Sequence, residues 1–165
     1  MTRKNLLNRS IVFMITAMLM FVLAGCSAGQ NQQNEEYVNS VKTLVNDSVN
    51  STRDLKEQDE TFNCHNETVS KEYIHSLDTL SELYQNLIKL NATADFDDLD
   101  KELSSEAALA LSDISEIKSL VSYAVEQEDD TLFQRDKNKI FDDYHTHYNR
   151  LTELSSEVQT RWRNA

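Results

Sequence analysis

The sequence predicts an all-α fold, an up-down-up-down antiparallel four-helix bundle. Apolar residues recur every three or four positions in four long segments, which is the spacing of an amphipathic helix. The connections between these segments are short, so consecutive helices are expected to lie side by side in opposite directions. The chain has no proline, and both of its glycines, Gly25 and Gly29, precede the four segments. No segment alternates apolar and polar residues as a strand does.

The first element of the chain is a basic and then apolar leader. Arg3, Lys4 and Arg9 precede a run from residue 11 to residue 24 that is apolar except for Thr16. This run is shorter than the about 20 apolar residues that a transmembrane helix needs. A basic segment followed by a short apolar run is typical of a cleaved export signal.

The apolar run ends in Leu23-Ala24-Gly25-Cys26, which resembles the lipobox of bacterial lipoproteins at every position. The resemblance implies a signal peptide over residues 1–25, cleavage between Gly25 and Cys26, and a diacylglyceryl group on the Cys26 thiol. It also implies fatty acylation, for example with palmitate, of the new amino terminus. Two or three acyl chains hold a protein firmly on a bilayer. The expected location is therefore the extracytoplasmic face of the cell membrane, or of an outer membrane if the cell has one.

After the leader we expect a lipidated cysteine and flexible tether over residues 26–34, and a helical bundle domain over residues 35–165. Asn34 is the predicted N-cap of the first helix, and Glu35 follows at the positive end of the helix dipole. The apolar stripe of this helix is Val38, Val41, Val45, Val49, Thr52 and Leu55. The stripe of the second helix is Val69, Tyr73, Leu77, Leu80, Tyr84 and Leu87.

The third and fourth helices have charges that complement their dipoles. Asp95, Asp97 and Asp98 lie at the start of the third helix, and Arg161 and Arg163 lie at the end of the fourth. The third stripe is Phe96, Leu99, Leu103, Ala107, Ala110, Ile114, Ile117, Val121 and Ala124. The fourth stripe is Phe133, Ile140, Tyr144, Tyr148, Leu151, Leu154, Val158 and Trp162.

Polar residues mark the connections between the helices. Asn, Asp and Thr, which favour caps and turns, gather in residues 60–68 and 91–95. Acidic residues gather in residues 126–130, where they disfavour a helix C-terminus and favour the next N-terminus. We therefore predict a turn at Asp129-Asp130. The alternative is one long helix from Asp95 to Trp162.

The charge of the chain limits its partners. The sequence has 16 Lys and Arg and 28 Asp and Glu. Three of the basic residues lie in the leader, so 13 basic and 28 acidic residues follow it, a net charge of −15. A surface this acidic repels nucleic acid. The expected partners are the membrane, through lipid on Cys26, and another envelope protein.

No catalytic residue, metal site or cofactor is predicted. Cys64 is the only cysteine after Cys26, so it forms no internal disulfide and either cross-links two chains or stays free. Glu72-x-x-His75 and Asp142-x-x-His145 have the spacing of di-iron bundle ligands. His75, however, lies about 200° around the helix from both Tyr73 and Leu77, which places it on the outward face.

Aromatic residues offer the best candidate for a binding site. They either fill the core or line a groove between helices, and His145 can pack between Phe141 and Tyr148. The predicted function is a non-catalytic bundle for protein interaction or envelope structure. The alternative is a bundle that binds or senses a small ligand in an interhelical aromatic pocket. The candidate pocket residues are Tyr84, Tyr123, Tyr144 and Tyr148. A cavity among them would favour the alternative, and a filled core with an exposed apolar stripe would favour the first function.

Overall fold

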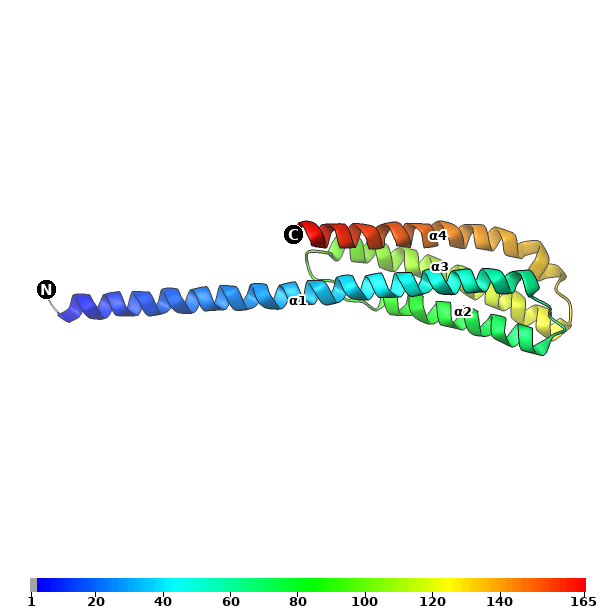
Figure 1. Cartoon of the computed structure of the whole chain (residues 1–165), viewed down its shortest axis with the longest axis horizontal. Helices are drawn as coiled ribbons and strands as arrows, with labels where there is room; N and C mark the ends of the chain where they lie inside the picture. The colour runs from blue at the N-terminus through cyan, green and yellow to red at the C-terminus, as the bar shows by residue number, and fades with distance from the viewer. Residues whose placement is uncertain (1–2) are drawn as a thin grey trace.

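The computed structural model describes the backbone of residues 3–165 and the side chains of residues 29–165. It contains four helices: α1 (Arg3–Thr61), α2 (Glu67–Ile88), α3 (Asp97–Gln127) and α4 (Thr131–Asn164). They form an antiparallel bundle in which each helix contacts the next and α4 returns to α1 (Figure 1). Residues 3–165 contain no strand. The predicted fold class is confirmed.

The predicted signal peptide and Cys26 lie outside the residues whose side chains are described, so the lipobox and its cleavage stay predictions. Within the described residues, no helix is long and apolar enough to cross a membrane.

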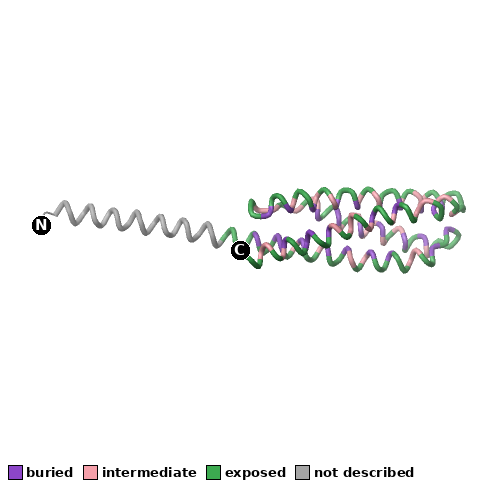
Figure 2. The backbone as a smooth tube through the Cα atoms, turned by 90° about the horizontal axis from the view of Figure 1, so that it is seen from above, coloured by how far each residue is buried: buried purple, intermediate pink, exposed green. Residues whose placement is uncertain are grey.

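The predicted stripes meet along the bundle axis and form one core (Figure 2). Every residue of the third stripe is buried, as is most of the fourth; Tyr148 and Trp162 are partly buried at its edge. The second stripe departs from the prediction at its start, because Val69 is only half-buried and Ser70 is buried beside it. The first stripe departs likewise, because Val49 is only half-buried and Ser48 takes the buried position beside it. Burial of this serine is tolerated because its hydroxyl donates to the Val45 carbonyl at 2.8 Å.

The start of α1 also differs from the prediction. Residues 29–34, expected as part of a flexible tether, are helical, so Asn34 is not an N-cap. Its side chain is buried, donates to an Asp95 carboxylate oxygen at 2.8 Å, and accepts from the Thr93 hydroxyl. Gln30 donates to the same carboxylate oxygen at 3.0 Å. We call Gln30, Asn34, Thr93 and Asp95 the polar clamp; it joins α1 to the α2–α3 connection.

The other helix ends follow local rules. Asn66 is the N-cap of α2, and its side-chain oxygen accepts from the backbone N–H groups of Thr68 and Val69. The α3 helix ends where Glu128 adopts a left-handed conformation with φ 52°. The Asp129 N–H then donates to the Ala124 carbonyl at 3.0 Å, the long hydrogen bond of a Schellman motif. The predicted turn is confirmed, and the single long helix is excluded.

Packing is uneven around the bundle. The α1–α4 pair makes the least extensive contact of the four neighbouring helix pairs. A surface groove opens along this pair, and the core hydroxyl groups lie beneath it.

Candidate functional site

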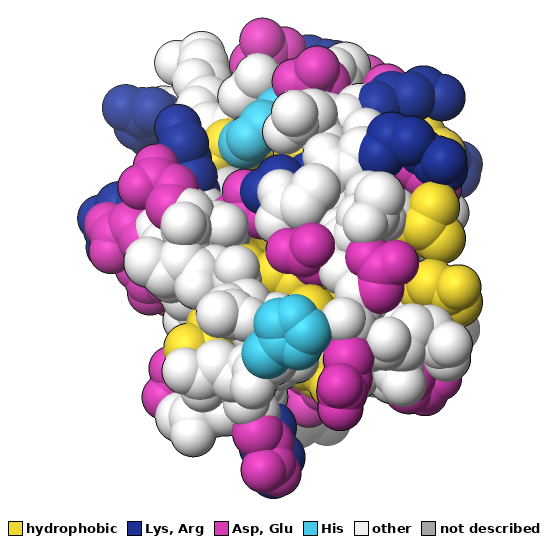
Figure 3. All heavy atoms as spheres, turned by 90° about the vertical axis from the view of Figure 1, so that its right-hand side faces the viewer, with side chains coloured by type: hydrophobic (Ala, Val, Ile, Leu, Met, Phe, Trp, Pro, Cys, Tyr) yellow, Lys and Arg dark blue, Asp and Glu magenta, His cyan; other side chains and the backbone are white. Residues whose placement is uncertain are grey.

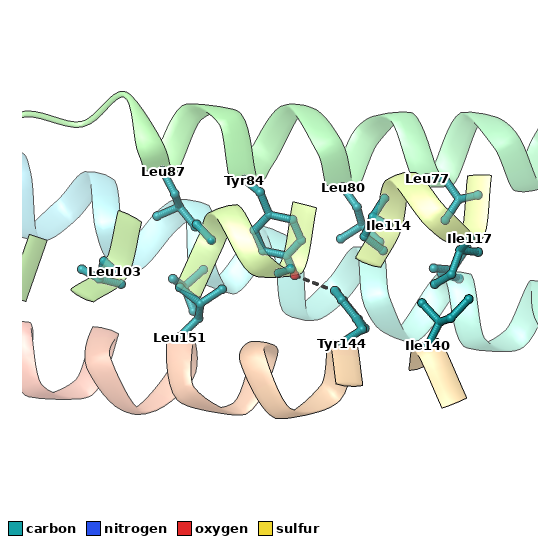
Figure 4. Close-up of a cluster of buried hydrophobic side chains, with 14 of the residues drawn as sticks. Leu77, Leu80, Tyr84, Leu87, Leu103, Ile114, Ile117, Ile140, Tyr144 and Leu151 are labelled. Atoms are coloured by element: carbon teal, nitrogen blue, oxygen red, sulfur yellow. Dashed lines mark hydrogen bonds between the residues drawn. The ribbon is translucent and has the colours of Figure 1, made fainter. Parts of the chain in front are cut away.

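Three hydroxyl groups meet in the middle of the core, one each from α1, α2 and α4. The Tyr84 and Tyr144 oxygens are 2.6 Å apart (Figure 4), and the Tyr144 and Thr52 oxygens are 2.5 Å apart. Thr52 donates to the Ser48 carbonyl at 2.7 Å, so its oxygen accepts from Tyr144 and Tyr144 accepts from Tyr84. We call Tyr84, Tyr144 and Thr52 the hydroxyl chain. It satisfies buried polar groups of three helices at once.

Both phenols of the chain keep their protons at physiological pH. Burial raises the pKa of Tyr84 to about 12, and burial raises the pKa of Tyr144 well above its ordinary value. Neutral phenols serve as hydrogen-bond donors, so the chain is a fixed polar element of the core.

The groove between α1 and α4 lies over the end of this chain. Its volume is about 360 Å³, within the range of small-molecule sites. Its lining residues are Thr52, Lys56, Asp59, Asn138, Phe141, Asp142 and His145. Thr52 therefore belongs both to the hydroxyl chain and to the groove.

An ion pair neutralises one of the acids in the groove. Asp59 accepts from the Lys137 ammonium at 2.9 and 3.1 Å and from the Tyr73 hydroxyl at 3.3 Å. The Asp59 and Lys137 side chains are only 21% and 13% exposed, and the ammonium lies 5.1 Å from the centre of the Phe133 ring. This pair links α1 to α4 and fixes the Asp59 side chain.

Two aromatic rings form one side of the groove. The Phe141 and His145 ring centres are 6.5 Å apart, and His145 lies edge-on to Tyr148 at 6.2 Å. The prediction that His145 packs between Phe141 and Tyr148 is confirmed. Both groove rings are half-buried, so their outer faces remain available to a ligand.

The predicted pocket tyrosines do not line a common cavity. Tyr84 and Tyr144 are fully buried in the core, and Tyr148 packs beside Tyr144 with 6.1 Å between ring centres. Tyr123 is 46% exposed on the outward face of α3. None of the four lines the groove between α1 and α4. Helical spacing identified the aromatic residues, but it did not predict that the groove would lie between α1 and α4.

A second polar cluster joins α3 to α4. The His147 Nδ1 atom is 2.7 Å from a Glu106 carboxylate oxygen, and its Nε2 atom is 4.0 Å from Asp113. That Asp113 oxygen is buried without a hydrogen-bond partner, and burial raises the pKa of Asp113. Of the two histidines with di-iron spacing, His145 lines the groove between α1 and α4, and His75 is exposed as predicted. Among the side chains of residues 29–165, no cluster of three or more His, Cys, Asp or Glu has the arrangement of a metal site.

Cys64 lies in the α1–α2 connection and is 6% exposed. Burial, followed by the nearby acid Asp130, raises the pKa of its thiol, which disfavours the reactive thiolate. Its side chain packs with the hydrophobic core.

Comparison of the chain with protein-family models, with curated proteins and with solved structures finds no match in any of the three.

Proposed function

We propose that this chain is an exported bacterial lipoprotein, anchored by lipid on Cys26, whose helical bundle binds another envelope protein without catalysing a reaction. The sequence Leu23-Ala24-Gly25-Cys26 after a basic and apolar leader carries this proposal. The fold is compatible with it. The polar clamp begins at Gln30, four residues after Cys26, so an anchored bundle would start at the membrane surface.

Replacing Cys26 tests the anchor directly. Cys26→Ala removes the thiol that would receive the diacylglyceryl group, so incorporation of a labelled fatty acid should be lost and uncleaved precursor should accumulate. The measurements are fatty-acid labelling, membrane fractionation and the mass of the mature amino terminus.

Cys64→Ala is the matched control, because the other cysteine is buried in the bundle. It should keep both labelling and cleavage. A Cys26→Ala protein that is still cleaved and labelled like the wild type would contradict the proposed anchor.

Exposed hydrophobic side chains on the outward face of α3 support the proposal that the bundle binds another protein. Leu109 and Tyr123 are the most exposed large hydrophobic side chains of the described residues, at 45% and 46%. They lie fourteen positions apart, so the helical repeat places them within about 40° of each other on one face. A photoreactive amino acid at position 109 should cross-link the bundle to its protein partner in cells. Tyr123→Lys should abolish this adduct. Position 53 on α1 serves as the control.

The second candidate function is small-ligand binding, and the groove between α1 and α4 favours it. The core itself is filled by Tyr84 and Tyr144, so the predicted pocket among the tyrosines does not support this function. The groove beside the core has a suitable volume and both polar and aromatic lining. The end of the bundle that carries the α1–α2 and α3–α4 connections has no comparable lining. Figure 3 shows acidic, basic and neutral side chains mixed on that end, with hydrophobic side chains in small separate areas.

A further inference from the structure

We propose that the groove between α1 and α4 binds a small zwitterion, an α-amino acid with an apolar side chain. This proposal rests on the second candidate function above and names its ligand.

The groove has one available charge of each sign, on different helices. Lys56 comes from α1 and Asp142 from α4, and both side chains are exposed. Neither takes part in a salt bridge within the described side chains. Opposite charges that do not pair with each other can each bind the opposite charge of a ligand. A carboxylate would be bound by Lys56 and an ammonium group by Asp142.

Asp59, the other acid in the groove, does not change this balance of charges. Asp59 is already paired with Lys137 and accepts a hydrogen bond from Tyr73. The available charges of the groove therefore sum to zero. A ligand with one charge would leave either Lys56 or Asp142 without a partner, whereas a zwitterion satisfies both.

The apolar part of the ligand has a defined place. Phe141 and His145 are one helical turn apart on α4 and present two rings on the same side of the groove. Asp142 and both rings line the same groove, so an ammonium group at Asp142 leaves the adjoining side chain within reach of the rings. Asn138 supplies an uncharged hydrogen-bonding group to the lining. A volume of about 360 Å³ accommodates a ligand of this class.

Three probes with the same ring separate the two charges. L-Phenylalanine has both charges, 2-phenylethylamine lacks the carboxylate, and 3-phenylpropionate lacks the ammonium group. Binding is measured by titration calorimetry on the full chain in detergent. Phenylalanine should bind saturably in the millimolar range or below, and each singly charged probe should bind about tenfold more weakly.

Variants assign each charge to its residue. Asp142→Asn should weaken phenylalanine and 2-phenylethylamine about tenfold and leave 3-phenylpropionate unchanged. Lys56→Gln should weaken phenylalanine and 3-phenylpropionate and leave 2-phenylethylamine unchanged. Asp143→Asn is the matched control, because this neighbouring acid is exposed and does not line the groove; it should bind all three probes like the wild type. Because all three positions are exposed, unchanged melting temperatures should show that the variants fold.

The binding results distinguish a wrong ligand from the absence of small-ligand binding in the groove. If 2-phenylethylamine or 3-phenylpropionate binds as tightly as phenylalanine, the groove binds a ligand of another charge and the zwitterion is wrong. If none of the three binds at millimolar concentration, both the zwitterion and small-ligand binding in this groove are wrong. Equal loss in Asp143→Asn and Asp142→Asn would also overturn the assignment.

Discussion

The hydroxyl groups of Tyr84, Tyr144 and Thr52 depend on one another, because the core around them offers few other polar groups. Tyr144→Phe removes the middle hydroxyl and leaves the buried Tyr84 donor without its acceptor. A buried hydrogen-bonding group without a partner costs about 1–3 kcal/mol. We therefore expect Tyr144→Phe to lower the free energy of unfolding by this amount, measured by urea denaturation.

Two further variants control this experiment. Tyr148→Phe changes a half-buried residue outside the hydroxyl chain and should alter stability by less than about 0.5 kcal/mol. The double variant Tyr84→Phe, Tyr144→Phe removes the stranded donor as well, so it should recover part of the loss. A double variant as unstable as the sum of two single losses would show that the hydroxyls act independently.

Asp113 makes stability depend on pH. Burial raises its pKa in the folded protein, so the folded state binds more protons than the unfolded state around that pKa. The contribution of Asp113 to the free energy of unfolding is therefore present at low pH, and it is lost as the pH rises through the pKa of Asp113 in the folded protein. Asp113→Asn should raise the melting temperature at pH 7, and this gain should vanish at a pH below about 3.9, the pKa of an unfolded aspartate.

Asp47→Asn is the control for this effect, because Asp47 is exposed on α1. It should show no comparable gain at pH 7. A lower melting temperature for Asp113→Asn at pH 7 would mean that the attraction between Asp113 and His147 outweighs the cost of burying the carboxylate.

At the level of single elements, the end of α3 holds a residue in an unfavourable conformation. A left-handed conformation costs a residue with a Cβ roughly 1–2 kcal/mol, and glycine avoids that cost but loses more entropy on folding. Glu128→Gly should therefore stabilise the protein by about 0.5–1 kcal/mol, measured by thermal and urea denaturation. Glu126→Gly, inside the last turn of α3, should instead destabilise it by about 0.5–1 kcal/mol. Equal effects at the two positions would contradict the Schellman geometry.

The sequence predicted those features of the elements that depend on local spacing. The stripe from Phe96 to Ala124 is buried throughout because helical repeat alone decides which face it occupies. The N-cap prediction for Asn34 failed because Asp95 and Thr93, about sixty residues later in the chain, bind its amide. A local sequence pattern cannot predict a contact between residues so far apart in the chain.

The candidate site was predicted only in part, for the same reason. The aromatic content of α4 and the packing of His145 followed from positions three and four apart on one helix. The groove depends on how far α1 and α4 separate, which is set by packing of the whole bundle. The pairing of Asp59 with Lys137 across that interface likewise has no signal in either helix alone.

For the whole molecule, a single continuous core implies cooperative unfolding. Ile114→Asp places a carboxylate where the side chain is fully buried among apolar groups, so it should unfold the bundle or cost several kcal/mol. Ser115→Asp adds the same charge at the neighbouring exposed position and should leave the far-UV circular dichroism and melting nearly unchanged. A stable Ile114→Asp protein would show that the core tolerates water at its centre.

The polar clamp also has a mechanical consequence for an anchored protein. Asp95 binds Gln30 and Asn34 of α1 through its side chain and Arg161 of α4 through its carbonyl, so the α2–α3 connection ties two helices together at one end. Tension between a lipid on Cys26 and a partner on the outward face of α3 would run parallel to the helices and load these bonds in shear. The C-terminus lies at the clamped end, so tension applied there would peel α4 away (Figure 1). In single-molecule pulling from residue 29, attachment at residue 123 on α3 should therefore require a higher rupture force than attachment at residue 165.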